Sequence, residues 1–217
     1  MTAMNGTEHS KGGDFEEATR SLLDLHGGRL LDLAAASILN GLDSGRPLHP
    51  SEDDYPAALW RPGASFVTIK KSGRLRGCIG SLAAQRPLAV DVAENAFACA
   101  FRDPRFAALE SGEWDEVSLS VTILSPSQPM AFESEAELLG QLRPGADGLI
   151  IEDGRHRALF LPAVWESLPE KKAFLAHLKV KAGLAADHWS DTFTARRFVA
   201  LDVSGDVSGD ISDKDTP

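Results

Sequence analysis

The clearest pattern in the sequence is a two-faced strand at residues 117–124. This segment reads VSLSVTIL, so Val, Leu, Val and Ile alternate with Ser, Ser, Thr and Leu. A period of two is typical of a β-strand with one buried face. The other face is rich in hydroxyl groups, and Ser125-Pro126 ends the strand. The pattern therefore predicts a sheet that packs on one side only.

Similar patterns predict the other elements of the first half. Residues 65–71 alternate, and Ser72-Gly73 then leads into LRGCIG at 75–80, which is a hairpin signal. Helical periodicity over 15–42 is interrupted at Gly27-Gly28, so we predict a helix only from 30 to 40, ending near Gly41. Pro87 opens a second helix that ends near Arg102. Asp103-Pro104 predicts a further helix start, with the aspartate as cap.

The second half repeats this order of elements. The predicted elements are a capped helix at 134–142, strands at 148–153 and 156–161 joined by Gly154-Arg155, a helix at 169–183 and a last strand at 198–203. Two successive passes of hairpin, helix and strand indicate an internal structural duplication around one mixed or antiparallel sheet. The fold class is therefore α+β.

Composition and charge limit the kind of protein this can be. The ordered domain is predicted at 14–203, with a disordered start at 1–13 and a disordered acidic tail at 204–217. A formal charge of -10 argues against a broad basic surface, so neither nucleic acid nor an anionic membrane is an expected partner. Because no apolar run could span a bilayer or serve as a signal peptide, we expect a cytoplasmic protein with no membrane contact. Cys78 and Cys99 should then be reduced.

The segment 74–80, RLRGCIG, carries the most informative chemistry. In a strand, Arg74, Arg76 and Cys78 would share one face, so the thiol would lie beside a permanent cation that favours thiolate. Gly77 and Gly80 would leave space beside the thiol for a ligand. The alternative is that Cys78 is a small core residue and the glycines mark a bulge. Both interpretations fit the residues alone.

A basic run surrounds the same predicted hairpin. Lys70, Lys71, Arg74 and Arg76 have no acidic residue among them, so they could hold a carboxylate or phosphate, with Arg76 best placed for bidentate contact. Solvated charges on an edge hairpin are the alternative.

Other chemistry has little support in the sequence. No phosphate-loop, dinucleotide-binding, nucleophile-elbow or zincin motif is present, so no motif encodes a cofactor or a metal site. His156, His177 and His188 lie far apart in sequence and could join a site only through folding.

Several segments together resemble the AMMECR domain family. They are FVTI followed by LRGCIG, then NAFACAFRDPRF, VSLSVTIL, and GRHRALFLPAVW with FLAHLKVKAGL. Bacterial and archaeal members of this family are called protein A of the AmmeMemoRadiSam system. The resemblance covers about 15–203 and implies an α+β fold of two subdomains, with duplicated strand-helix units around a barrel-like sheet and packed helices.

The resemblance also implies partners and site residues. Family genes accompany a Memo-like protein and a radical S-adenosylmethionine protein, and this chain lacks the metal-binding motifs of both, so it would be the third component. In an enzyme, Cys78 would be the nucleophile or redox thiol and Arg76 the stabiliser of thiolate or anion. Asn95 and Arg105, which match the family pattern, would be polar neighbours. Because no base lies near Cys78 in sequence, a binding module using the same face remains the alternative.

Overall fold

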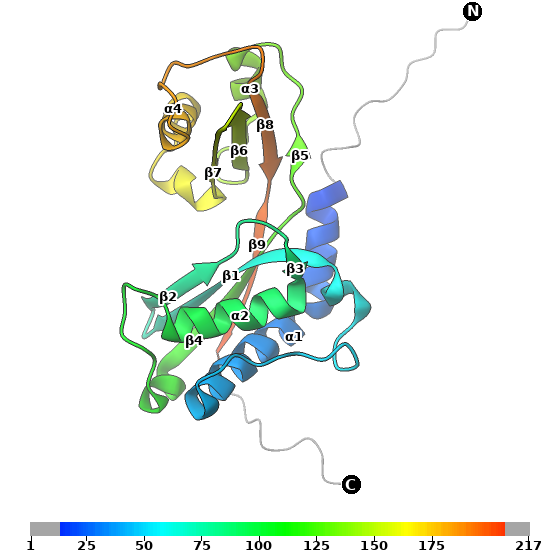
Figure 1. Ribbon diagram of the computed structural model, residues 1–217, viewed down its shortest axis with the longest axis vertical. Coiled ribbons are helices and arrows are strands. Elements are labelled where there is room, and N and C mark those ends of the chain that lie inside the picture. Colours follow the sequence, from blue (N-terminus) through cyan, green and yellow to red (C-terminus); the bar gives the residue numbers. More distant parts are fainter. Residues whose placement is uncertain (1–13, 207–217) are drawn as a thin grey trace, which may run out of the picture. The chain divides into compact units, whose positions relative to one another are not determined.

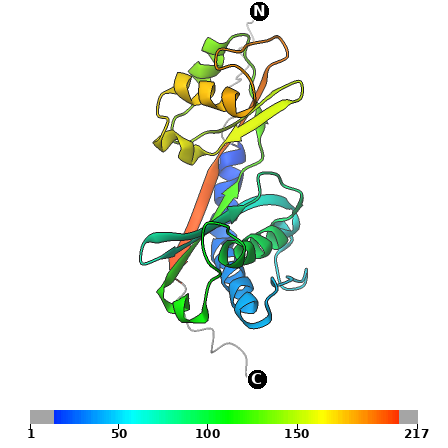
Figure 2. The same cartoon turned by 60° about the vertical axis from the view of Figure 1, so that its left-hand side comes forward.

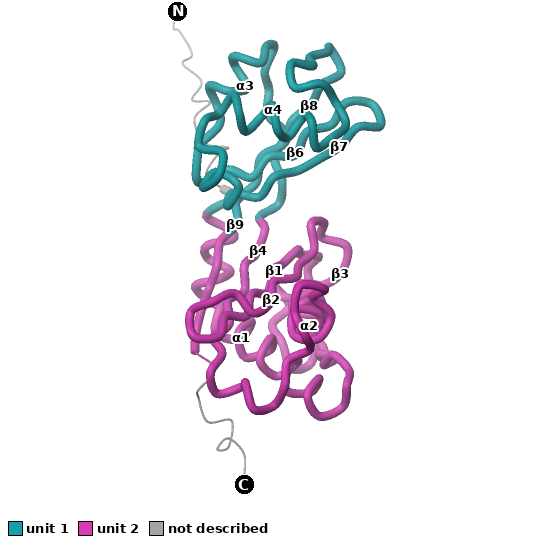
Figure 3. Tube along the Cα trace, turned by 90° about the vertical axis from the view of Figure 1, so that its left-hand side faces the viewer, with its two compact units in different colours: residues 1–16, 125–200 teal, residues 17–124, 201–217 magenta. Residues whose placement is uncertain are grey.

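The computed structural model describes residues 14–206, and it divides the chain into two compact units. Unit 1 comprises residues 1–16 and 125–200, and unit 2 comprises 17–124 and 201–217 (Figure 3). Residues 125–200, the larger part of unit 1, are thus inserted in the sequence between the two segments of unit 2. The predicted disordered start at 1–13, and the part of the predicted tail at 207–217, lie outside the described residues.

Unit 2 is built on a five-stranded sheet. Its strands are β1 (Pro62–Lys71), β2 (Arg74–Gly80), β3 (Arg86–Pro87), β4 (Val117–Leu124) and β9 (Ala200–Asp206). Their order is β2-β1-β4-β9, with β3 paired to β1. Ser72 and Gly73 both have positive φ, 48° and 76°, which gives the β1–β2 hairpin a tight two-residue turn.

Two helices cover one face of this sheet, α1 (Asp14–Ser44) and α2 (Leu88–Phe101) (Figures 1 and 2). Short 3-10 helices lie at Ala57–Trp60 (η1) and Ser111–Glu116 (η2).

The two faces of the sheet differ in burial. The apolar positions of β4 from Val117 to Ile123 are buried and join α1, α2 and β1 in one core, whereas its hydroxyl positions are half-buried. The hydroxyl side lies on the face away from α1 and α2. We call it the open face, and it includes Thr68, Lys70, Cys78, Ser118 and Ser120.

Unit 1 has a second, four-stranded sheet. Its strands are β5 (Gln128–Pro129), β6 (Gly148–Asp153), β7 (His156–Phe160) and β8 (Thr194–Phe198), in the order β5-β8-β6-β7. The helices are α3 (Glu135–Gln141), η3 (Pro162–Glu166) and α4 (Lys171–Lys181). Trp165 stacks on Phe174 in the core, with ring centroids 3.7 Å apart. The fully buried Lys179 pairs with Glu135, and this ion pair ties α4 to α3.

The structure confirms the α+β class and corrects the expected sheet. The chain forms two separate sheets in which every registered pairing is antiparallel, rather than one mixed, barrel-like sheet. Each unit nevertheless has a hairpin, a helix and a third strand that pairs with the first hairpin strand. In unit 2 these are β1–β2, α2 and β4, and in unit 1 they are β6–β7, α4 and β8.

Three predicted boundaries were wrong. Helix α1 runs through Gly27 and Gly41, because these glycines allow close packing rather than ending the helix. The predicted last strand at 198–203 is in fact the end of β8 followed by β9, which continues to Asp206. The predicted domain end at 203 therefore lies three residues too early.

Among residues 14–206, no helix combines the length and the apolar character needed to cross a membrane.

The glycines of α1 supply a stability test. A Cβ at Gly41 would lie 2.3 Å from the ring of Phe101 and 2.8 Å from that of Phe97, whereas a Cβ at Gly28 would meet nothing within 4 Å. Gly41→Ala should therefore lower the free energy of unfolding by about 1–3 kcal/mol through overpacking. Gly28→Ala, the matched control, should raise it by up to about 1 kcal/mol through helix propensity. Urea unfolding measures both, and equal effects would contradict the packing explanation.

Candidate functional site

Cys78 lies on the open face, near the end of the edge strand β2. It is directly opposite Thr68 of β1, and the Thr68 hydroxyl donates a hydrogen bond to Sγ over 3.4 Å. Thr68 in turn pairs with Ser120 of β4. A thiol and two hydroxyl side chains therefore form a row across three strands, and Cys78 is half-buried within it.

The main chain of Cys78 is fixed by an aspartate and an arginine. The Cys78 N–H donates to Oδ2 of Asp103 over 2.9 Å, and its carbonyl accepts from Arg105 over 3.0 Å. Arg105 also pairs with Asp103, and these bonds hold the pKa of the Asp103 carboxyl well below its usual range. The predicted helix at Asp103-Pro104 does not form, because the aspartate satisfies the edge of β2 instead of a helix end.

Arg76 is engaged by a different acidic residue. Its Nε and one terminal nitrogen bind both carboxylate oxygens of Glu113, and its guanidinium also donates to the carbonyls of Ala107 and Ala108. All three nitrogens of Arg76 thus have partners, and an anionic ligand would have to displace Glu113. The arginine that contacts Cys78 is Arg105, through the carbonyl.

The two glycines of the motif are explained by packing. A Cβ at Gly77 would lie 2.5 Å from the carbonyl oxygen of Cys99 in α2, and one at Gly80 would lie 2.3 Å from the ring of Phe66.

The second cysteine, Cys99, is 1% exposed, and burial raises the pKa of its thiol to about 12. The two cysteines therefore differ, since only Cys78 is partly accessible.

Asn95 belongs to a buried polar network rather than to the surroundings of Cys78. Asp91 of α2 is 1% exposed and accepts hydrogen bonds from Ser65, Ser81, Arg86 and Asn95. This network ties the start of β1 and the segment after β2 to the first turns of α2. The sequence signal for it was the pair of polar residues, Asp91 and Asn95, four positions apart in a helix that is otherwise apolar except for Glu94.

The three histidines that could join a site only through folding, His156, His177 and His188, all belong to unit 1. His156 contacts the carbonyl of Ala182, His177 is exposed on α4, and His188 pairs with Asp153.

Asp153 holds a cluster that sequence reasoning missed. Hydrogen bonds from Thr192, His188 and Ser190 lower its pKa to about 2. Ser190 donates to the aspartate and not to the histidine, so these residues do not form a nucleophile–base–acid relay. Its members come from segments about 35 residues apart, and no local motif could have revealed them.

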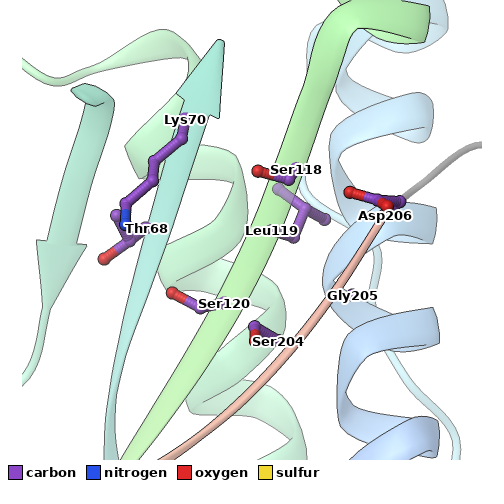
Figure 4. A pocket seen from close by; sticks show the side chains of 8 residues that line it. All are labelled: Thr68, Lys70, Ser118, Leu119, Ser120, Ser204, Gly205 and Asp206. Carbon is purple, nitrogen blue, oxygen red and sulfur yellow. The ribbon is translucent and has the colours of Figure 1, made fainter. Parts of the chain in front are cut away.

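A groove of about 360 Å³ lies on the open face beside Thr68 (Figure 4). Its lining residues come from β1, β4 and β9, namely Thr68, Lys70, Ser118, Leu119, Ser120, Ser204, Gly205 and Asp206. The serines of β4 have short side chains, so they leave a hollow between the longer side chains of Lys70 and Asp206 on the neighbouring strands.

Of the sequence-predicted site residues, the structure brings only Arg105 into hydrogen-bond contact with Cys78. Arg74 does not share the face of Cys78 as predicted, because a bulge between Ile69 and Lys70 places Arg74 opposite Lys71 on the other side of the sheet. Gly77 and Gly80 are packed closely, and Asn95 belongs to the Asp91 network.

The buried network predicts a large effect of Asp91→Ala. This change would leave Arg86, Ser65 and Asn95 without their shared acceptor, so the free energy of unfolding should fall by about 3–5 kcal/mol. Asp115→Ala is the control, because Asp115 is exposed and the change should stay within about 0.5 kcal/mol. Urea unfolding of the two variants tests this, and a small loss for Asp91→Ala would show that the network contributes little.

The Arg76–Glu113 pair predicts a pH dependence. Hydrogen bonds from Arg76 lower the pKa of Glu113 from 4.5 to about 2. A carboxyl whose pKa is lower in the folded state stabilises the fold at higher pH, so this contribution should be lost as the pH falls from 4.5 to about 2. Glu113→Gln should be less stable than the natural protein at pH 7, and the difference should shrink below pH 4.5. A difference that stayed constant over this range would contradict the assignment.

Comparison with known proteins identifies relatives of this chain in sequence and in fold. A protein of Methanothermobacter thermautotrophicus is 37% identical over 147 residues, covering 65% of this chain and 74% of the relative. A protein of Thermofilum pendens is 35% identical over 202 residues, covering 83% of this chain and 92% of the relative. The crystal structure of protein PH0010 from Pyrococcus horikoshii superposes with a TM-score of 0.66 at 31% identity, covering 80% of this chain and 88% of PH0010.

Residues 31–202, which include the whole of the Cys78 row and the Asp91 network, match the AMMECR1 family. With most of its length matched in sequence and in fold, the chain belongs to the AMMECR1 family.

Proposed function

We propose that this protein is a binding component that holds a small polar ligand on the open face of unit 2. The observation that carries the proposal is the row of Cys78, Thr68 and Ser120 beside the groove. Within the described residues, the hydroxyls of Ser118, Ser120 and Ser204 make no hydrogen bond to another side chain or to the main chain, so they are free to bind a ligand. Convergent polar groups in a concavity are the usual form of a small-molecule site.

Binding explains the geometry better than catalysis by an arginine-activated thiol. Arg76 is neutralised by Glu113, and Arg105 is paired with Asp103. A nucleophilic thiol also needs a base within hydrogen-bond reach, and the one side chain that donates to Sγ of Cys78 in the described structure is the hydroxyl of Thr68. A binding site needs no base. It needs rigidly placed contacts, and Asp103 and Arg105 hold the main chain of Cys78 in place.

We further propose that the ligand is handled for partner proteins in an AmmeMemoRadiSam system, as family membership suggests. A Memo-like protein and a radical S-adenosylmethionine protein would supply the redox chemistry, for which this chain's two cysteines cannot provide an iron–sulfur ligand set. Both thiols are unpaired, which favours the reducing cytoplasm as the location.

One observation favours a thiol enzyme as the second candidate. The Thr68 hydroxyl donates to Sγ of Cys78, and this hydrogen bond would orient the sulfur for attack on a substrate. If Cys78 is a nucleophile, it should react with iodoacetamide at pH 7 faster than free cysteine does, and Thr68→Val should slow that reaction. If Cys78 only contacts a ligand, its rate should be no faster than that of free cysteine.

The binding proposal is tested with a small-molecule cell extract and purified full-length protein. The natural protein should retain at least one compound, detected by mass spectrometry, and this compound should slow iodoacetamide labelling of Cys78. Ser120→Tyr, which fills the groove, should abolish both effects. Thr194→Tyr, an exposed strand position in unit 1, is the control and should abolish neither.

The measurements should be repeated with the Memo-like and radical S-adenosylmethionine proteins added. If no compound is retained under either condition, the binding function is wrong. If Ser120→Tyr and Thr194→Tyr behave alike, the site is not on the open face.

A further inference from the structure

We infer that the groove on the open face binds a zwitterion, a small molecule with a carboxylate at one end and an ammonium at the other. This inference rests on the proposed function and names the class of its ligand. It arises from the two charged residues of the groove, Lys70 and Asp206, which have opposite signs and lie on different strands (Figure 4).

Neither charge has a partner within the part of the chain that the structure describes. Among residues 14–206, no ion pair or side-chain hydrogen bond involves Lys70 or Asp206, although the adjacent Lys71 pairs with both Glu113 and Glu116. Arg76 is also paired. Lys70 therefore remains the cation of the groove that is free to bind a carboxylate, and Asp206 the anion that is free to bind an ammonium.

The spacing of the two charges fits a short zwitterion. Strand β4 separates β1, which carries Lys70, from β9, which carries Asp206, so the two strands lie about 10 Å apart, which is two strand spacings. Both residues line the same groove. A dipeptide is about 7 Å long when extended, so its termini could meet both charged groups.

The floor of the groove suits the middle of such a ligand. Ser118 and Ser120 lie between the charged residues, and each hydroxyl can donate and accept one hydrogen bond, as a peptide group requires. A neutral polyol would use these hydroxyls but neither charge. A simple anion would use Lys70 but be repelled by Asp206. A zwitterion uses all four groups.

The test uses glycylglycine and two blocked forms as probes, with full-length protein observed by amide chemical shifts. Glycylglycine should give saturable shifts at Ser118, Ser120 and Ser204. N-acetylglycylglycine lacks the ammonium and glycylglycinamide lacks the carboxylate, so each should bind about tenfold more weakly, because a hydrogen bond between charged groups is lost.

Two variants assign each end of the ligand. Lys70→Met should weaken glycylglycine binding and remove the preference for it over the amide, while the preference over the acetylated form stays. Asp206→Asn should show the reverse pattern, as expected when each mutation deletes one of two separable contacts. Lys172→Met is the control. It removes an exposed lysine of α4 in unit 1 and should leave all three affinities unchanged.

The outcomes distinguish this inference from the binding function itself. If the natural protein retains an extract compound that Ser120→Tyr loses, but glycylglycine gives no saturable shifts, the ligand is not a zwitterion of this kind and the binding function stands. Equal binding of all three probes, or equal effects of Lys70→Met and Lys172→Met, would likewise overturn the inference. The paired pattern of the two groove variants would establish it.

Discussion

The register between β1 and β4 is the constraint on which unit 2 depends. The two strands pair over eight residues, with Val67 opposite Val121 and Thr68 opposite Ser120. Because side chains alternate along a strand, this register places the aliphatic residues of β4 from Val117 to Ile123 against α1 and α2 and the hydroxyls from Ser118 to Thr122 on the other side. A slip of one residue would bury the serines and expose the valines. The core and the groove are therefore two consequences of one pairing.

The sequence predicted the strands and helix of the unit 2 core well, because hydrophobic and polar residues alternate regularly there. The strand at 117–124, the hairpin turn at Ser72-Gly73 and the helix after Pro87 all follow from local rules, and the structure confirms them. It failed where a local signal had a long-range cause. Gly27 and Gly41 look like helix breakers, but they are required by contact with Val203 and Phe101, which are distant in the sequence.

For the site too, features that follow from a local pattern could be predicted, and features that depend on long-range contacts could not. The position of Cys78 on an exposed strand face follows from alternation, but the partners of the charged residues do not. Asp103 resembles a helix cap and in fact completes the edge of β2, and Arg76 resembles an anion-binding residue and in fact binds Glu113. Asp91 gave only a weak signal, because a buried acid is acceptable only once its four partners are assembled around it.

The insertion of unit 1 within unit 2 affects how the protein is made. Residues 125–200 are synthesised between β4 and β9, so the last strand of the unit 2 sheet leaves the ribosome only after the larger part of unit 1. Until then, the nascent sheet ends at β4 and the groove lacks the wall formed by Ser204, Gly205 and Asp206. A chain that ends before β9 would thus contain most of the core residues of unit 2 and still lack one wall of the groove. In this topology the sheet of unit 2 is completed only after the intervening residues of unit 1 have been synthesised.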